Sequence, residues 1–222
     1  MQGSSAGEFA DLLDAVREGK GGDAKKFAET WPEVANRLES QGVYLSEGRN
    51  TIEWDDATLL FIGLRETADD GGPAEPLDRG ISMERLGRFP TDDGNAIAYL
   101  REFLIPEEEG DEGTRLLTQL DSGFRNEVRG HDKLSVGFGG LTLHGWLTET
   151  EVSSLRTYLQ QSVWKVAQNE TFDGGVREIV RHLLIILKTA EKRGVGILML
   201  SLIHISEPTR PLYISYAVFC LK

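Results

Sequence analysis

A long apolar helix predicted for residues 174–193 constrains the fold more than any other feature of the sequence. Its apolar side chains recur at helical spacing and cover more than half of the circumference: Val176, Ile179, Val180, Leu183, Leu184, Ile186, Leu187 and Ala190. A helix that is apolar on most sides has to be buried on most sides, so we expect it at the centre of the fold. Asp173 is expected to cap its first turn, and Gly194 to end it.

A β-hairpin over residues 133–146 is the second strong signal. Two alternating runs flank Gly139-Gly140, which can supply the positive φ angles of a two-residue turn. In that register Val136 faces Leu143 and Phe138 faces Leu141, with all four on the core side. The opposite face carries Ser135, Gly137, Thr142, His144 and Trp146.

Shorter elements follow from local signals. Capping boxes are expected at Ser5 with Glu8, Thr30 with Glu33 and Thr148 with Glu151, and single caps at Asp23 and Thr91. Residues 43–46, 51–54 and 195–199 are predicted to be strands. Residues 59–64 fit either a buried strand or a helix capped by Asp55 or Asp56. The pattern predicts an α+β fold, with a small, mostly antiparallel sheet packed against several helices.

Residues 200–222 resemble translated sequencing adapter. The segment LSLIHISEPTR, residues 200–210, is similar in frame to the end left by a transposase-based library kit. The segment ISYAVFCLK, residues 214–222, is similar to the adapter beyond the sample index, and residues 211–213 fit the bases between. The resemblance implies a read-through artefact that truncates the reading frame after residue 199 and replaces the native C-terminus. We expect this tail to be loosely placed, or to continue strand 195–199.

Residues 1–199 are acidic and lack cysteine. The whole chain carries a net charge of −12, and the tail contributes one negative and two positive side chains, so residues 1–199 carry −13. The only cysteine, Cys220, lies in the tail, so disulfide scaffolds, thiolate zinc sites and cysteine nucleophiles are excluded from residues 1–199. Nucleic acids and anionic membranes need a basic footprint, so we expect neither as a partner. The charge fits a basic protein partner, and the polar N-terminal residues predict a cytoplasmic protein.

The motifs of catalysis and cofactor binding do not assemble in this sequence. Residues 137–140, GFGG, lack the third glycine and the following helix of a dinucleotide fingerprint. His131, His144 and His182 do not stand at metal-ligand spacings. The acid pairs at 55–56 and 92–93 lie where helix caps are expected. We therefore assign no catalytic residue, no metal and no cofactor.

The binding candidates lie on and beside the polar face of the hairpin. Thr142, His144 and Trp146 share that face in the predicted register, and His131 lies just before the hairpin. Two interpretations stay open: a helix covers this face, or it forms an exposed aromatic–polar surface for a partner.

The sequence favours a non-enzymatic interaction protein, similar in kind to an immunity or antidote module that binds a basic partner. One alternative is a small hydrolase or metal-dependent enzyme in which His131, His144 and nearby carboxylates converge in one pocket. Another is a regulatory domain of a larger protein. Residues 1–199 are expected to form one domain, with or without an N-terminal helical appendage at 5–41, and with acidic loops at 68–76 and 106–113.

Overall fold

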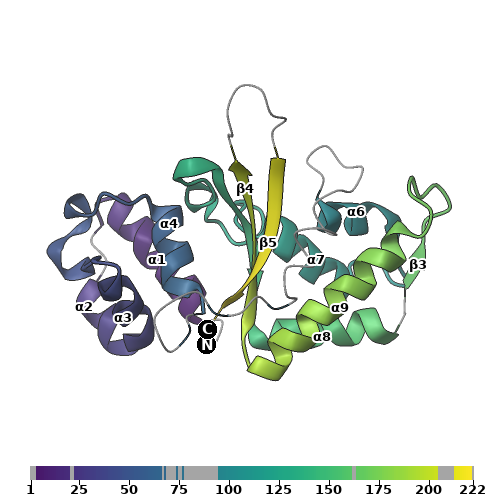
Figure 1. The fold of residues 1–222 in the computed structure, drawn as a ribbon, viewed down its shortest axis with the longest axis horizontal. Coiled ribbons are helices and arrows are strands. Elements are labelled where there is room, and N and C mark those ends of the chain that lie inside the picture. The colour runs from purple at the N-terminus through teal and green to yellow at the C-terminus, as the bar shows by residue number, and fades with distance from the viewer. Residues whose placement is uncertain are drawn as a thin grey trace.

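A computed structural model shows a small antiparallel sheet between two layers of helices (Figure 1). The structure describes residues 4–20, 23–66, 68, 74, 77, 95–161, 164–204 and 213–221. One layer contains α1 (Ser4–Arg17), α2 (Ala24–Thr30), α3 (Pro32–Ser40) and α4 (Asp56–Leu64). The other contains α6 (Ala96–Phe103), α7 (Glu112–Ser122), α8 (Glu149–Gln161) and α9 (Gly175–Arg193). The predicted α+β class is confirmed.

The sheet has the strand order β2-β4-β5, and both of its pairings are antiparallel. Its strands are β2 (Leu141–Leu147), β4 (Gly196–His204) and β5 (Tyr213–Leu221). A separate short ribbon pairs β1 (Leu104–Pro106) with β3 (Trp164–Val166). The strand predicted at 195–199 is therefore confirmed as the first part of β4.

Strand β4 divides the apolar core into two clusters. Ile197 and Met199 pack with the α6–α9 layer, whereas Leu198 and Leu200 pack with the α1–α4 layer. This alternation follows from the period of two in an extended strand. A strand buried on both faces reads as a continuous apolar run, which explains why residues 195–200 contain no charged side chain.

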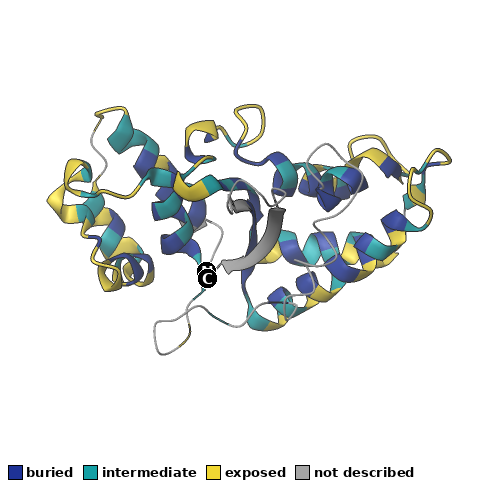
Figure 2. Ribbon diagram, turned by 45° about the horizontal axis from the view of Figure 1, so that its top comes forward, coloured by how far each residue is buried: buried dark blue, intermediate teal, exposed yellow. Residues whose placement is uncertain are grey.

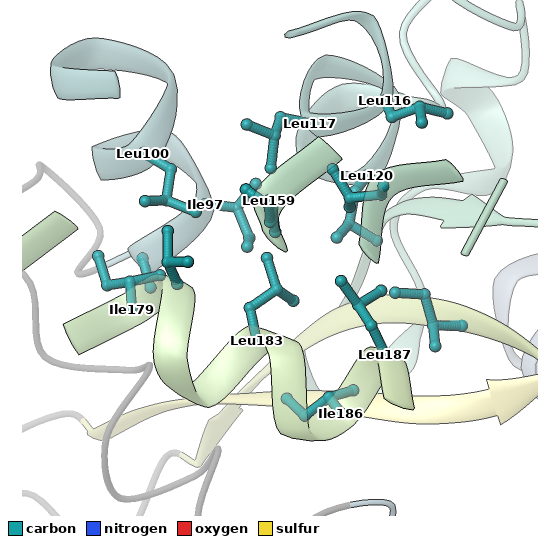
Figure 3. Packing of buried hydrophobic residues seen from close by; sticks show 14 of the residues in the cluster. Ile97, Leu100, Leu116, Leu117, Leu120, Leu159, Ile179, Leu183, Ile186 and Leu187 are labelled. Carbon is teal, nitrogen blue, oxygen red and sulfur yellow. The ribbon is translucent and has the colours of Figure 1, made fainter. Parts of the chain in front are cut away.

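Helix α9 lies at the centre of the larger cluster, as its apolar spacing predicts. Figure 3 shows Leu183 and Leu187 of α9 pointing towards the labelled side chains of α6, α7 and α8, and Ile186 on the opposite side of the helix. The helix also has an exposed stripe that contains Arg177, Arg181, Ile185 and Lys188. Figure 2 shows the same mixture of buried and exposed positions along both helical layers. The helix is therefore amphipathic, and its apolar stripe provides one wall of the core.

The start of α9 differs from the expectation. Gly174, with a φ of 79°, is the N-cap and makes no side-chain cap hydrogen bond, so the cap predicted at Asp173 is wrong. The Val176 backbone N–H instead donates to Glu170 Oε1 at 2.6 Å. A carboxylate at this position also complements the positive end of the helix dipole. The C-terminal end is as expected, because Gly194 has a φ of 64°.

The hairpin register is shifted by one residue from the predicted one. Val136 pairs with Thr142, and the connection is the loop of three residues Phe138–Gly140 rather than a two-residue turn. Gly139 and Gly140 do adopt positive φ angles, of 67° and 78°. A slip of one residue turns every side chain of the first segment to the other face. Val136 and Phe138 are consequently 68% and 75% exposed instead of facing the core.

A β-bulge in β2 corrects the predicted position of Trp146. The pairing with β4 shifts between Leu143 and Gly145, so His144 is an extra residue in the strand. The extra residue reverses the alternation, and Trp146 packs in the same cluster as Leu141 and Leu143. Trp146 is 1% exposed and therefore does not share the face of Thr142 and His144.

The remaining local predictions divide between confirmed and wrong. Thr148 and Glu151 form the reciprocal capping box, with hydrogen bonds of 2.9 and 3.2 Å, and Asp23 caps α2. Thr30 instead donates to the Lys26 carbonyl of the preceding helix, so its predicted box is absent. Residues 43–46 and 51–54 do not pair as strands, because short 3₁₀ turns occupy Leu45–Glu47 and Arg49–Thr51. Residues 59–64 are helical and belong to α4, which Asp55 caps.

Several predicted features fall wholly or partly outside the described residues. The cap at Thr91 and the acid pair 92–93 lie there, while α6 itself begins after Asn95, whose side chain accepts from the N–H groups of Ile97 and Ala98. Most of the acidic loop 68–76 lies there as well. The other acidic loop is shorter than predicted at its C-terminal end, because α7 begins at Glu112 behind the cap Asp111.

The segment that resembles adapter takes part in the sheet. Strand β4 continues through residue 200 to His204, which is one of the two placements expected for the tail. Strand β5 then pairs along the whole of β4, from Gly196 opposite Leu221 to His204 opposite Tyr213.

Candidate interaction surface

The four predicted binding residues lie on two different faces of the sheet. Thr142 and Ser201 are Cα partners, and His144 Nε2 lies 3.1 Å from Ser201 Oγ, on the same face as Met199. His131 instead lies beside the Trp146 ring, 6.2 Å between centroids, on the face covered by α1–α4. The sheet thus separates His144 from His131.

Trp146 is a core residue. Its ring contacts Phe124 edge-on at 5.0 Å between centroids, and the Arg129 guanidinium carbon lies 4.2 Å above it. Arg129 is held there by Glu151 at 3.1 Å. Burial lowers the pKa of Arg129 and Glu151 opposes that shift, but an arginine remains charged throughout the physiological range. These contacts fix the Trp146 ring inside the fold, where a partner cannot reach it.

His131 connects the strand region to α1. Its Nδ1 lies 2.8 Å from Asp14 Oδ2, and its Nε2 lies 3.6 Å from Asp11 Oδ1. The side chain is only 10% exposed, between α1 and the indole of Trp146. A carboxylate on one ring nitrogen is also the arrangement of a catalytic histidine. The second nitrogen, however, faces another carboxylate rather than a hydroxyl or a thiol, so the geometry favours a structural contact.

An ion-pair network continues from Asp14 to the N-terminus of α4. Asp14 lies 3.4 Å from Arg17, and Arg17 binds Asp56 Oδ2 through Nε and Nη2 at 2.9 and 2.7 Å. Arg49 reaches the other oxygen of Asp56 at 2.7 Å. Asp56 is therefore shared by two guanidinium groups, which lock α1, α4 and the segment between Arg49 and Trp54 together.

The Phe138 loop, which we define as residues 136–140, is bound by Asp55, the sequence neighbour of Asp56 in this network. Its Phe138 backbone N–H donates to Asp55 Oδ2 at 3.1 Å, and Asp55 also accepts from the Thr58 backbone N–H and hydroxyl. Trp54, the residue before Asp55, is 39% exposed. Asp55 therefore fixes the backbone of a loop that carries two strongly exposed apolar residues, Val136 and Phe138. Val136 pairs with Thr142, so its side chain lies on the Thr142 side of the hairpin. We call Val136 and Phe138 the apolar patch.

Two polar residues of the hairpin face remain outside this patch. Thr142 and His144 are half-buried, and they face the layer opposite to α1–α4. Sequence reasoning missed the apolar patch because it assigned Val136 and Phe138 to the core. The available signal was the glycine-rich turn, since three-residue loops with a left-handed glycine are as typical of hairpins as two-residue turns.

The pH dependence of the loop provides a prediction. Burial alone would raise the pKa of Asp55, but the hydrogen bonds from Thr58 and from the Phe138 N–H together hold it below its ordinary value. The stabilisation is therefore complete above the ordinary aspartate pKa of about 3.9 and is lost as the pH falls through the lower native pKa. We expect the Phe138 amide signal in NMR spectra to shift with that native pKa.

Asp55→Asn is the matched variant for this prediction. It retains an acceptor oxygen for the α4 cap but removes the charge, so the acid-induced shift of the Phe138 amide should disappear while the helix remains. An unchanged titration of the Phe138 amide in this variant would show that another group controls the loop.

A shallow polar pocket on the other layer is the main alternative site. It has a volume of about 360 Å³ and is lined by Glu112, Ser153, Ser154, Thr157, Tyr158 and Gln161. Burial, followed by Asp111, raises the pKa of the Tyr158 hydroxyl well above its ordinary value. A phenol that holds its proton this tightly is a poor general base at neutral pH. Ser153 donates to Glu191 at 2.9 Å, and Arg156 pairs with the same carboxylate at 2.8 Å. The hydrogen bonds from Ser153 and Arg156 hold the pKa of Glu191 below its ordinary value, so this carboxylate is a poor general base for activating Ser153.

Among the described residues, no group of three or more histidine, cysteine, aspartate and glutamate side chains is placed to hold a metal ion. No helix in the described part of the chain is both long and apolar enough to cross a membrane. A scan against protein-family models found no match for the chain, and neither a curated protein nor a solved structure matched it.

Proposed function

We propose that this protein is a non-enzymatic interaction module whose apolar patch binds a basic protein partner. The observation that carries the proposal is the exposure of Val136 and Phe138 on a loop held by Asp55. Exposed aromatic side chains on a fixed backbone lose little conformational entropy on binding, which is why they dominate many interfaces. The proposal therefore assigns recognition to this exposed loop rather than to a pocket.

The charge of the α1–α4 layer, to which Asp55 joins the loop, supports the choice of partner. Residues 4–66 contain 13 aspartate and glutamate residues but only 7 lysine and arginine residues, a net charge of −6. This is half of the net charge of −12 in less than a third of the chain. An acidic surface around an apolar patch attracts cationic partners at long range and repels acidic ones.

Selection from a phage-displayed random peptide library tests the proposal. The immobilised wild-type protein should enrich peptides that combine lysine or arginine with a large apolar residue. Binding of the selected peptides should weaken when the salt concentration rises from 50 to 500 mM, because surface charges are screened. Enrichment of acidic or uncharged peptides would refute the proposal of a basic partner, and so would an affinity that does not change with ionic strength.

A separate proposal concerns residues 200–222: they are encoded by adapter rather than by the source genome. The proposal rests on the resemblance of two adapter halves in order and in frame. An independent read of the source DNA, from a library made without transposase, should diverge from this sequence after codon 199. A read that encodes IHISEPTR with no adapter downstream would overturn the proposal.

A further inference from the structure

We infer that the cleft between α1 and residues 45–49 binds one large apolar side chain from a lysine- or arginine-rich segment of the partner. This inference rests on the proposed function and adds a second contact to it. The cleft has a volume of about 210 Å³. Ligand pockets for whole small molecules usually span about 300–1,000 Å³, so the cleft suits a single side chain better than a cofactor.

The lining of the cleft is apolar. Leu12, Leu13 and Val16 of α1 form one wall, with Ala24, Leu45, Gly48 and Arg49 around them. A Cβ atom added to Gly48 would meet nothing within 4 Å, so that side of the cleft is open. An apolar side chain that enters would be desolvated against the leucines without displacing any existing contact at Gly48.

Arg49 does not make the cleft an anion site. Its Nε donates to Asp56 at 2.7 Å, Nη1 to the Ile52 carbonyl at 2.8 Å and Nη2 to the Trp54 carbonyl at 2.6 Å. Every nitrogen of the guanidinium group is therefore engaged, and the aliphatic stem is what Arg49 presents to the cleft.

The charged residues beside the cleft select a cationic segment. Three exposed carboxylates adjoin lining residues in the sequence: Asp11, Asp23 and Glu47. Lys25 is the exposed cation among these neighbours, while Arg17 and Arg49 pair with Asp56. A chain of hydrogen bonds also links the cleft to the Phe138 loop. Arg49 binds Asp56, and the adjacent Asp55 accepts the Phe138 N–H at 3.1 Å.

NMR titration with short synthetic peptides tests the inference. The pentapeptide Lys-Lys-Phe-Lys-Lys should shift the signals of Leu12, Leu13 and Val16, and it should bind at least about tenfold more tightly than Lys-Lys-Gly-Lys-Lys. Glu-Glu-Phe-Glu-Glu should not bind. Equal binding of the phenylalanine and glycine peptides would overturn the inference, because it would show attraction by charge alone.

Variants that fill the cleft separate it from the rest of the surface. Ala24→Phe should lower the affinity for Lys-Lys-Phe-Lys-Lys at least about tenfold. If this variant fails to fold, Val16→Phe is the substitute, because Val16 lines the same cleft. Ala35→Phe on α3 has a similar starting exposure outside the cleft and should bind like wild type. Unchanged binding to a folded Ala24→Phe or Val16→Phe variant would overturn the inference.

The outcomes also distinguish this inference from the proposed function. If Ala24→Phe binds neither the phenylalanine pentapeptide nor the phage-selected peptides, the result supports both the inference and the proposed function. If Ala24→Phe still binds the phage-selected peptides with wild-type affinity, the cleft plays no part in partner binding, and the proposed function stands without it. If the phage-selected peptides are not basic, the proposed function fails even where the cleft still takes the pentapeptide.

Discussion

Replacing Gly145 with alanine is expected to destabilise the fold by about 3 kcal/mol or more, because the backbone cannot make room for the added methyl group. A Cβ atom at this position would lie 2.0 Å from the Gln119 carbonyl oxygen and 2.7 Å from that of Leu120. Both contacts are with the backbone of α7, which approaches β2 here. A thermal melt should show the midpoint lowered by roughly 6–12 °C for a chain of this size.

Gly7→Ala is the matched control for this substitution. Gly7 lies inside α1, and nothing lies within 4 Å of the position that its Cβ would occupy. Alanine in a helix interior is favoured over glycine by about 0.5–1 kcal/mol, so this variant should melt at or above the wild-type temperature. If Gly145→Ala has the same melting temperature as Gly7→Ala, the result would contradict the close packing of α7 on β2.

Removing the Asp56 carboxylate should have the second-largest effect. The Asp56 side chain is 11% exposed and pairs with both Arg17 and Arg49. Removing one partner of a fully buried pair costs about 3–5 kcal/mol. The two arginines are 25% and 24% exposed, so water relieves part of this penalty. We therefore expect Asp56→Ala to lower the free energy of unfolding, measured by urea denaturation, by about 2 kcal/mol.

A double-mutant cycle assigns this loss to the ion pair. The combined Arg17→Ala and Asp56→Ala variant should be less destabilised than the sum of the single variants. The exposed pair of Glu18 and Lys20 is the control, with side chains 44% and 74% exposed. Glu18→Ala should leave the urea midpoint unchanged within error. Additivity of the Arg17 and Asp56 substitutions would show that the network does not hold α1 to α4.

The elements that sequence could predict are those governed by local signals. The apolar period of α9, the run of β4 and the Thr148–Glu151 box each depend on residues close together in the chain. The helical state of 59–64 was left open because Leu59 and Leu60 suit either structure, and the cap at Asp55 decides it. The segment is buried against α1, although burial had been expected only for the strand alternative.

The errors arise where tertiary contacts override local pattern. The bulge at His144 accompanies the contact between Gly145 and the α7 backbone, more than 20 residues away in sequence, and no local pattern reports it. The hairpin slip follows from the loop geometry, since one residue more in the turn exposes Val136 and Phe138. The side chains exposed by the hairpin were therefore predicted one register step away from those observed, although the turn had been located.

The charged network was also beyond the reach of sequence reasoning. Asp56 was interpreted as a possible helix cap, whereas its partner Arg17 stands 39 residues earlier in the chain. Likewise His131 pairs with Asp14 across 117 residues. Such pairs need the layer arrangement of the fold before they can be recognised.

The most direct test of the proposed function compares the affinity of one phage-selected basic peptide for three proteins by isothermal titration calorimetry. The proteins are wild type, the double variant Val136→Ser with Phe138→Ser, and the control Phe172→Ser. Phe172 is 51% exposed, and its backbone N–H donates to Tyr99 of α6 in the α6–α9 layer. The double variant should melt close to wild type because both side chains are exposed. We predict that it binds at least about tenfold more weakly, while Phe172→Ser binds like wild type. Equal affinity of the double variant and wild type would contradict the proposal that the apolar patch is the binding surface.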